Sequence, residues 1–348
     1  TPLYSSAASD VYKRQVPDIR WFANRSTVAT SIVRVLLRGP APYLEGSVSS
    51  AIPGGTNLVR QSVPISDSSA EVGLTGTGVA NADQLTLERI HTQLEQTLKS
   101  GHSANSVQLS VDDKSVETGK LADYEEAAID PQVPNPQVGV LDGDLVTYSD
   151  GQSRKVAGLA PASVHPSHPA MDTKRQTYAY TDDDGSHLAI RSTGGEAKDV
   201  DLPENISKPS FDPRSWVWGG GQDGSVLALN AQGSNDAPET VTADWLKGQN
   251  IRSLQISRDG TRALVVTKEG NGSRVWVSGI NRDNDGTPRS LGEPLQVGAT
   301  RNVTQAAWIS DSQVVVANEQ DGSVQVVSLA GDTQDVNGLS DIQNISAG

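Results

Sequence analysis

The sequence predicts a multidomain protein in which a small α+β domain is followed by an all-β propeller. Three observations lead to this prediction. An Asp-Gly or Asn-Gly pair, followed by a strand-like apolar run, recurs along the second half of the chain. The recurring glycines are 39 to 50 residues apart, which is the usual length of a propeller blade. Two segments with helical periodicity lie before the first repeat, so helices are expected in the N-terminal part.

Composition limits the class of protein. A chain of 348 residues can form about two domains, each with its own core. The 33 glycines and 18 prolines favour a loop-rich, ordered protein. The net charge of −14 argues against nucleic-acid binding and against attraction to an anionic membrane surface. No cysteine is present, which excludes disulfides, thiolate metal sites and cysteine nucleophiles within this sequence.

Both ends of the sequence suggest a fragment. Residues 1–15 have no hydrophobic period and resemble translated adapter sequence, so we expect a non-native, disordered leader. No signal peptide is recognisable, and no apolar run approaches the roughly 18 residues of a membrane-spanning helix. Only 26 residues follow the last repeat glycine, and we therefore expect the propeller to be truncated at Gly348.

Residues 16–118 are predicted to form the small α+β domain. Residues 26–38 have a helical apolar face. The clearest helix spans residues 84–100, with Asp83 as its N-cap and Gly101 just after its end. Alternating apolar residues predict two strands, at Ala70, Val72 and Leu74 and at Val107, Leu109 and Val111. Two helices covering one face of a short sheet would account for this pattern.

The propeller is predicted over residues 138–348, after an acidic, proline-rich linker at residues 119–137. About five blade units are visible. Each unit contains a strand, an Asp-bearing turn, a second strand, a glycine hairpin, a third strand and a variable stretch for a fourth. The hairpin glycines are Gly143, Gly185, Gly224, Gly272 and Gly322. Such glycines supply the positive φ that a tight hairpin turn requires, so we interpret them as structural.

The α+β domain has a family resemblance in its loops. Leu-Leu-Arg-Gly-Pro at residues 36–40 is followed by Ser-Ala-Ile-Pro-Gly-Gly-Thr at residues 50–56, and then by the predicted strand at residues 70–74. This run resembles the signature of GerMN domains, which pair a helix ending in Gly-Pro with an Ile-Pro-Gly loop before a strand. The resemblance extends over residues 16–118.

A GerMN-like domain followed directly by a bacterial propeller resembles LpqB, a lipoprotein family of the actinobacterial cell envelope. The phrase Leu-Gln-Ile-Ser-Arg-Asp-Gly at residues 254–260 is similar to the blade turn of bacterial propellers. The resemblance implies a lipid anchor on the outer face of the plasma membrane, although this sequence lacks the lipid-attachment cysteine. It also implies binding to the extracellular domain of the MtrB sensor kinase, with effects on envelope and cell-division signalling.

The histidines do not predict a metal centre. His165 and His168 are three residues apart and could share one ion, but no third ligand lies near them in the sequence. We therefore interpret them as a loop pair at the entrance of a blade. His91 lies beside the apolar stripe of the second helix, and we interpret it as a boundary residue of the core.

Three adjacent carboxylates, Asp182, Asp183 and Asp184, are candidates for Ca²⁺ binding or acid–base chemistry. Calcium loops need alternating ligands and a Glu further on, which the sequence lacks here. Glycosidases need two carboxylates roughly 5 to 10 Å apart across a cleft, which a sequence does not establish. We interpret the cluster as a solvated hairpin tip.

The remaining motifs predict no catalytic, metal or cofactor site. No Gly-x-Ser-x-Gly or Ser-x-x-Lys motif occurs with an activating partner, and the glycines at residues 219–221 open no helix that could bind phosphate. Trp21 and Trp245 lie outside the predicted blade strands and are candidates for exposed rings. Four other tryptophans are expected to fill the space between blades: Trp216, Trp218, Trp276 and Trp308.

The preferred hypothesis is a non-catalytic envelope lipoprotein that modulates an MtrB-type sensor kinase by binding its extracellular domain, as the resemblance implies. The alternative is a peptidoglycan- or glycan-binding envelope protein, in which Trp21 or Trp245 would stack on sugars. A third hypothesis is a propeller enzyme that acts on glycans, for which the aspartates at residues 182–184 are the only motive. The sequence assigns no partner-binding residues.

Overall fold

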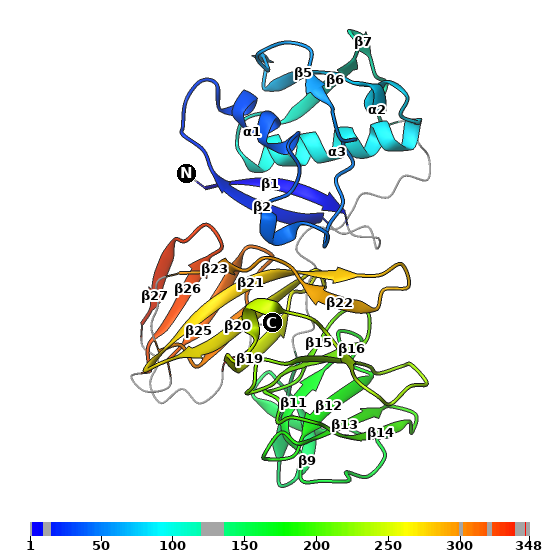
Figure 1. The fold of residues 1–348 in the computed structure, drawn as a ribbon, viewed down its shortest axis with the longest axis vertical. Helices are drawn as coiled ribbons and strands as arrows, with labels where there is room; N and C mark the ends of the chain where they lie inside the picture. Colours follow the sequence, from blue (N-terminus) through cyan, green and yellow to red (C-terminus); the bar gives the residue numbers. More distant parts are fainter. Residues whose placement is uncertain are drawn as a thin grey trace. The chain divides into compact units, whose positions relative to one another are not determined.

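The structure is a computed structural model of the chain. It describes residues 2–9, 15–119, 136–298, 302–318, 322–337 and 345. The chain divides into two compact units, Thr1–Ile129 and Asp130–Gly348, and the division falls within the stretch predicted as a linker. Most of that linker, residues 120–135, lies outside the described residues. The first unit contains the long helices, and the second is built mainly of strands (Figure 1).

The N-terminal residues form a hairpin, which differs from the expectation of a disordered leader. β1 (Pro2–Ser9) pairs antiparallel with β2 (Gln15–Trp21). Val16 and Asp18 of β2 are buried, so β2 belongs to the folded unit. An antiparallel partner satisfies the backbone N–H and C=O groups of β2, and this pairing requires no hydrophobic period in the partner strand.

The first unit contains four described helices. These are α1 (Val28–Leu36), the 3₁₀ helix η1 (Pro42–Leu44), the one-turn α2 (Thr77–Ala80) and α3 (Gln84–Ser100). Asp83 caps α3 as predicted, because its side chain accepts a hydrogen bond from the backbone N–H of Thr86 at 2.8 Å. At the other end His102, rather than Gly101, has the left-handed conformation, with φ at 49°. The His102 N–H donates to the carbonyl of Lys99, which satisfies one of the last carbonyls of the helix.

The sheet of the first unit has the strand order β3-β5-β6-β7, and β4 also pairs with β5. Its strands are β3 (Asn57–Leu58), β4 (Ile65–Ser66), β5 (Ser69–Thr75), β6 (Ser106–Val111) and β7 (Lys114–Ser115). β5 and β6 are parallel, and α2 and α3 lie in the connection between them. Ile32 of α1, Leu74 of β5 and Leu94 of α3 are fully buried in one core. The core therefore lies between the helices and the sheet, and α3 runs beneath β5 and β6 in Figure 1.

The described part of the second unit contains five antiparallel sheets that follow one another along the chain. The first has β8 (Gln137–Leu141), β9 (Asp144–Ser149) and β10 (Gln152–Lys155). The second has β11 (Ser167–Met171), β12 (Thr177–Thr181), β13 (His187–Ser192) and β14 (Ala197–Asp201). The third has β15 (Ser210–Phe211), β16 (Trp216–Gly220), β17 (Val226–Asn230) and β18 (Glu239–Thr240).

The fourth and fifth sheets complete the described part of this unit. The fourth has β19 (Asn250–Ile256), β20 (Arg262–Glu269), β21 (Gly272–Arg282) and β22 (Pro288–Leu291), with β23 (Leu295–Gln296) also paired to β21. The fifth has β24 (Gln305–Trp308), β25 (Gln313–Ala317), β26 (Val324–Ser328) and β27 (Thr333–Val336). A 3₁₀ helix, η2 (Asp244–Leu246), connects the third sheet to the fourth. Residues 346–348, at the expected truncation, lie outside the described residues.

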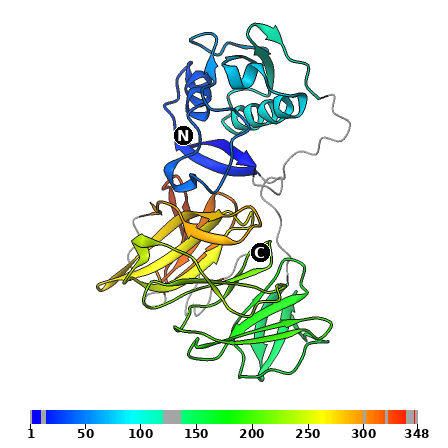
Figure 2. The same ribbon diagram turned by 45° about the vertical axis from the view of Figure 1, so that its right-hand side comes forward.

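The five sheets are arranged as propeller blades. The first strand of each sheet contacts the first strand of the next, in the order β8, β11, β15, β19 and β24. The cores lie between successive sheets: Ile190 of β13, for example, is in one buried cluster with Val217 of β16 and Leu229 of β17. In Figure 2 the green, yellow and red sheets are seen as separate blades. The predicted fold class, a small α+β domain followed by a propeller, is confirmed.

The hairpin glycines follow the prediction with one exception. Positive φ occurs at Gly143 (80°), Gly185 (76°), Gly224 (88°) and Gly322 (69°). In the fourth sheet, however, Gly272 is the first residue of β21, and the positive φ of 55° belongs to Gly270. Glu269 pairs with Gly272, so Gly270 and Asn271 form a two-residue loop with its positive φ at the first position. The prediction of Gly272 as the turn residue was wrong, because the pairing register selects the earlier of two glycines that flank Asn271.

Candidate functional site

A cavity of about 620 Å³ lies at the centre of the propeller unit, where the first strands of the five described sheets meet. Its wall includes Val138 of β8, Ala170 of β11, Phe211 of β15, Ile256 of β19 and Trp308 of β24. This volume is within the roughly 300 to 1,000 Å³ that is typical of small-molecule sites. The innermost strands of a propeller surround its central channel, and this cavity occupies that position.

Basic side chains are prominent among the polar residues of the cavity wall. Lys208 and Arg258 are both half-buried in the wall, and His165 and His168 also line it. Burial lowers the pKa of Lys208, because the ammonium group has lost water and no described residue forms an ion pair or hydrogen bond with it. The wall therefore contains a cation whose charge is not compensated by a described neighbour.

Two carboxylates also line the cavity, and each has other partners. Asp172 is buried, and its Oδ1 accepts hydrogen bonds from the backbone N–H groups of Gln176 and Thr177 at 2.8 and 3.0 Å. Asp183 is exposed, and its Oδ1 lies 3.8 Å from Nδ1 of His165. The first carboxylate accepts hydrogen bonds from a turn and the second faces an imidazole, and neither forms an ion pair with the half-buried Lys208 in the described structure.

The backbone of β11 is irregular at His168, which lies in a β-bulge. Ser167 pairs with Thr181 and Ala170 with Ala179, so β11 has one more residue than β12 in this interval. His168 has φ at 48°, a left-handed conformation that is uncommon for residues other than glycine, although histidine adopts it more often than most. Its Nδ1 is 3.5 Å from the hydroxyl of Thr181, and the residue lines the cavity. Bulges of this kind reorient a side chain away from the regular strand alternation.

Of the histidines considered in the sequence, two lie together and one lies elsewhere in the fold. His165 and His168 both lie at the cavity, where the described residues contain no group of three His, Cys, Asp or Glu side chains that could hold a metal ion. His91 lies between α3 and β6, with Nε2 3.0 Å from the carbonyl oxygen of Val107. This is the core-boundary position that the helical stripe predicted.

The three adjacent aspartates have three different environments. Asp182 closes its own turn, because its carboxylate accepts hydrogen bonds from the N–H and hydroxyl of Ser186 and from the N–H of His187. Burial opposes ionisation of Asp182, but these hydrogen bonds outweigh it and lower the pKa. Asp183 lines the cavity, and Asp184 is exposed. The interpretation as a solvated tip therefore holds for only part of the cluster.

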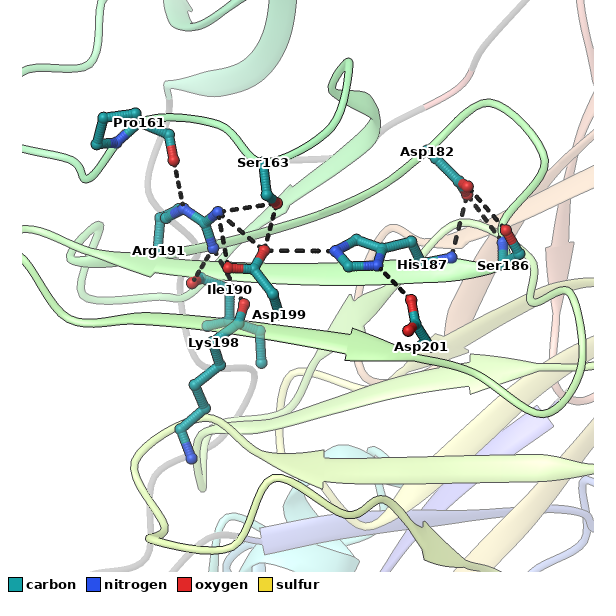
Figure 3. A network of polar contacts seen from close by, with 10 residues as sticks. All are labelled: Pro161, Ser163, Asp182, Ser186, His187, Ile190, Arg191, Lys198, Asp199 and Asp201. Atoms are coloured by element: carbon teal, nitrogen blue, oxygen red, sulfur yellow. Dashed lines mark hydrogen bonds and ion pairs between the residues drawn. The ribbon is translucent and has the colours of Figure 1, made fainter.

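A second polar cluster lies on the second sheet and is centred on Asp199 (Figure 3). The Asp199 carboxylate accepts hydrogen bonds from Nη2 of Arg191 at 2.9 Å and from the hydroxyl of Ser163. The carboxylate also lies 3.4 Å from Nε2 of His187, whose Nδ1 is 2.9 Å from Asp201. One imidazole is thus held between two carboxylates from the adjacent strand β14.

Charge and burial set the ionisation of this cluster. Burial disfavours the charged imidazole of His187, but the hydrogen bonds to Asp201 and Asp199 outweigh it and raise the pKa of His187. Burial likewise opposes ionisation of Asp199, but hydrogen bonds from Ser163, Arg191 and His187 lower its pKa. The structure therefore favours the charged form of both partners.

The Asp199 cluster resembles a nucleophile triad in composition but not in geometry. The Ser163 hydroxyl donates to the Asp199 carboxylate, whose lowered pKa makes it a weak base, and not to an imidazole, so the serine–imidazole hydrogen bond of a triad is missing. Arg191 also donates to the carbonyl of Pro161 at 3.2 Å. The cluster thereby fastens the connection between β10 and β11 to the outer strands of the second sheet, which is a structural role.

Comparison with known families explains why this propeller follows an α+β domain. The family model described as "Lipoprotein LpqB beta-propeller domain" matches residues 143–343, more than half of the chain. This chain belongs to the LpqB lipoprotein family. The Germane model, described as "Sporulation and spore germination", matches residues 2–117. The two resemblances drawn from the sequence are thus confirmed, and the Germane match begins within the leader that was expected to be non-native.

Curated LpqB lipoproteins of actinobacteria are related to this chain over most of its length. The relative from Mycobacterium ulcerans is 26% identical over 93% of this chain and 60% of its own length. The relative from Mycolicibacterium smegmatis is 25% identical over 92% of this chain and 59% of its own. The relative from Corynebacterium diphtheriae is 22% identical, with coverage of 91% and 57%. This chain therefore spans about 60% of the length of these LpqB relatives.

The curated relatives are named as lipoproteins. Among the described residues of this chain, no helix is long and apolar enough to cross a membrane.

In this LpqB-family propeller, the arginines of buried ion pairs at the Asp-bearing turns also make contacts between blades. Asp259 and Arg262 form a fully buried pair, and Nη1 of Arg262 donates to the backbone carbonyl of Asp311 in the next sheet at 2.6 Å. Asp212 of the third sheet likewise pairs with Arg282 of the fourth. Arg262 is only three residues after Asp259 in the sequence, whereas Arg282 is 70 residues from Asp212 and has no local signal.

The tryptophans of the LpqB propeller are mostly internal. Trp216, Trp218 and Trp308 are buried, and Trp276 is half-buried. Trp245 is also half-buried: its Nε1 donates to the carbonyl of Gly292 at 3.1 Å, and its ring centroid lies 5.8 Å from that of Trp276. The expectation of an exposed Trp245 is therefore wrong, because the neighbouring ring covers it. Trp21 of the first unit retains 56% exposure.

Proposed function

We propose that this chain is the interaction module of a non-catalytic envelope lipoprotein, which modulates an MtrB-type sensor kinase by binding the kinase's extracellular domain. Membership of the LpqB family is the observation that carries this proposal. In the full-length protein, a lipid anchor would hold the module at the outer face of the plasma membrane. Contact with the sensor domain would then affect envelope and cell-division signalling.

The arrangement of polar groups supports a binding role over a catalytic one. The most elaborate described cluster, around Asp199, uses its serine, histidine and arginine to join a connection to a blade. The buried pair of Asp259 and Arg262 joins one blade to the next. These groups are engaged in holding a rigid platform, and rigid platforms with variable loops are suited to protein recognition.

Direct binding between the intact lipoprotein and the purified extracellular domain of the kinase tests this proposal. We expect saturable binding in a pull-down and in biolayer interferometry, with no binding to the extracellular domain of an unrelated sensor kinase. Absence of binding by a lipoprotein whose thermal unfolding shows it to be folded would contradict the proposal.

A second candidate function is binding of peptidoglycan or another envelope glycan, which the exposed ring of Trp21 favours. An exposed indole offers an apolar face on which a sugar ring can stack. Sedimentation with purified cell-wall material should then retain the wild-type chain and release the Trp21→Ala variant. Equal sedimentation of the two proteins would contradict a role of Trp21 in glycan binding.

A further inference from the structure

We propose that the central cavity of the propeller binds a small ligand through an oxyanion, either a carboxylate or a phosphate, with Lys208 as its principal partner. Arg258 and His168 line the same cavity and would supply further donors. This binding site is separate from the proposed contact with a kinase and does not depend on it.

The environment of Lys208 carries the argument. A buried charge is costly unless an opposite charge or several hydrogen bonds compensate it. Loss of water lowers the pKa of Lys208, and no described residue pairs with its ammonium group. Asp172 accepts hydrogen bonds from the backbone N–H groups of a turn, and Asp183 is exposed beside His165. Neither acidic group of the wall forms an ion pair with Lys208 in the described structure. An oxyanion in the cavity would provide such a partner.

The bulge at His168 is a second, independent observation. A left-handed conformation at a residue other than glycine costs free energy and persists where the surrounding structure enforces it. Here the bulge in β11 gives His168 that conformation, and the exposed imidazole lines the cavity. A regular strand would avoid this cost. The position of His168 is therefore explained if its imidazole donates to a ligand in the cavity.

The rest of the wall indicates what kind of ligand carries the oxyanion. Met171, Phe211 and Trp308 contribute apolar surface to the same cavity. The volume of about 620 Å³ matches a small molecule rather than a folded partner. The wall has two basic side chains, Lys208 and Arg258, and two carboxylates, Asp172 and Asp183, so an anion there would be held by individual donors and not by a general positive field. The expected ligand thus combines one oxyanion with an apolar body.

Isothermal titration of the full chain with inorganic phosphate and, separately, with succinate tests the proposal at constant ionic strength. We expect one-site, saturable binding of at least one of the two probes, and the preferred probe then identifies the oxyanion as phosphate or carboxylate. Lys208→Gln should weaken that binding about tenfold or more, because a charge-assisted hydrogen bond is lost. Lys208→Arg should retain it within a few-fold, since the charge is kept.

Lys268→Gln is the matched control, because Lys268 is exposed on β20, carries the same charge and does not line the cavity. It should bind the probe as the wild type does. Thermal unfolding of each variant shows that it is folded, and removal of a desolvated charge at Lys208 is not expected to lower the melting temperature. The proposal is overturned if neither probe saturates the wild type, or if Lys208→Gln and Lys268→Gln bind with equal affinity.

Discussion

Replacement of Gly185 by valine tests two roles of this hairpin glycine: the positive φ of the turn and the close approach of the backbone at Ile206. Gly185 has φ at 76°, a conformation that costs about 1–2 kcal/mol for residues with a Cβ and more for β-branched ones. A Cβ at Gly185 would also collide with the carbonyl oxygen of Ile206. The Ile206 N–H donates to the Gly185 carbonyl at 2.9 Å, and displacing it would cost about 1 kcal/mol more. We therefore expect Gly185→Val to destabilise the propeller unit by about 2–4 kcal/mol.

Gly151→Val separates the two contributions. Gly151 has φ at 78°, almost the same as Gly185, but no atom lies within 4 Å of the Cβ that a substitution would add. This variant should lose only the conformational part, about 1–2 kcal/mol. Urea unfolding, followed by far-ultraviolet circular dichroism, measures the loss of unfolding free energy in each variant, provided that both have the same dependence of this free energy on urea concentration. Equal losses in the two variants would refute the packing argument, and an unchanged midpoint for Gly185→Val would refute the turn argument as well.

Two further predictions concern the ion pairs of the propeller. Asp259→Asn should destabilise the fold by about 3 kcal/mol in urea unfolding, because it removes the nearer counter-charge of the buried Arg262 and leaves Asp311, at 3.9 Å, as its counter-charge among the described residues. The exposed Asp184→Asn should change stability by less than about 0.5 kcal/mol. A loss as small as that of the control would show that the pair is not needed. The second prediction concerns His187. Burial disfavours its charged form, but the hydrogen bond to Asp201 helps to raise its pKa. The charged imidazole therefore stabilises the folded state below about pH 6.5, and this contribution is lost as the pH rises through the folded-state pKa. Melting temperatures between about pH 5.5 and pH 8.5 should therefore fall relative to those of His187→Gln, and parallel pH profiles would contradict this.

Local signals in the sequence were sufficient for much of the fold. Asp83 and the apolar stripe after it predicted α3, and the cap is present in the structure. The Asp-Gly pair at Gly185 predicted a turn with positive φ. Each of these features depends on residues within one turn or one hairpin, where backbone conformation and hydrophobic period act over a few positions.

Features that depend on how strands pair could not be predicted from these local signals. In Glu-Gly-Asn-Gly the local sequence allows either glycine to make the turn, and the pairing of Glu269 with Gly272 selects Gly270. The leader is a similar case, because Pro2–Ser9 becomes a strand through backbone pairing with β2 and not through a pattern of its own. Backbone hydrogen bonds are shared by all residue types, so composition alone does not reveal them.

The candidate site shows the same division between short-range and long-range information. The sequence already established a repeat with one hairpin per blade, a negative chain without cysteine, and histidines three residues apart. Packing of the blades then decided that His168 of one blade, Lys208 before the next and Arg258 of a third line one cavity. It also placed Arg262 against Asp311, 49 residues away. Packing of successive blades brings together the first strands of segments about 40 to 50 residues apart, and their side-chain chemistry can be combined only once that packing is known.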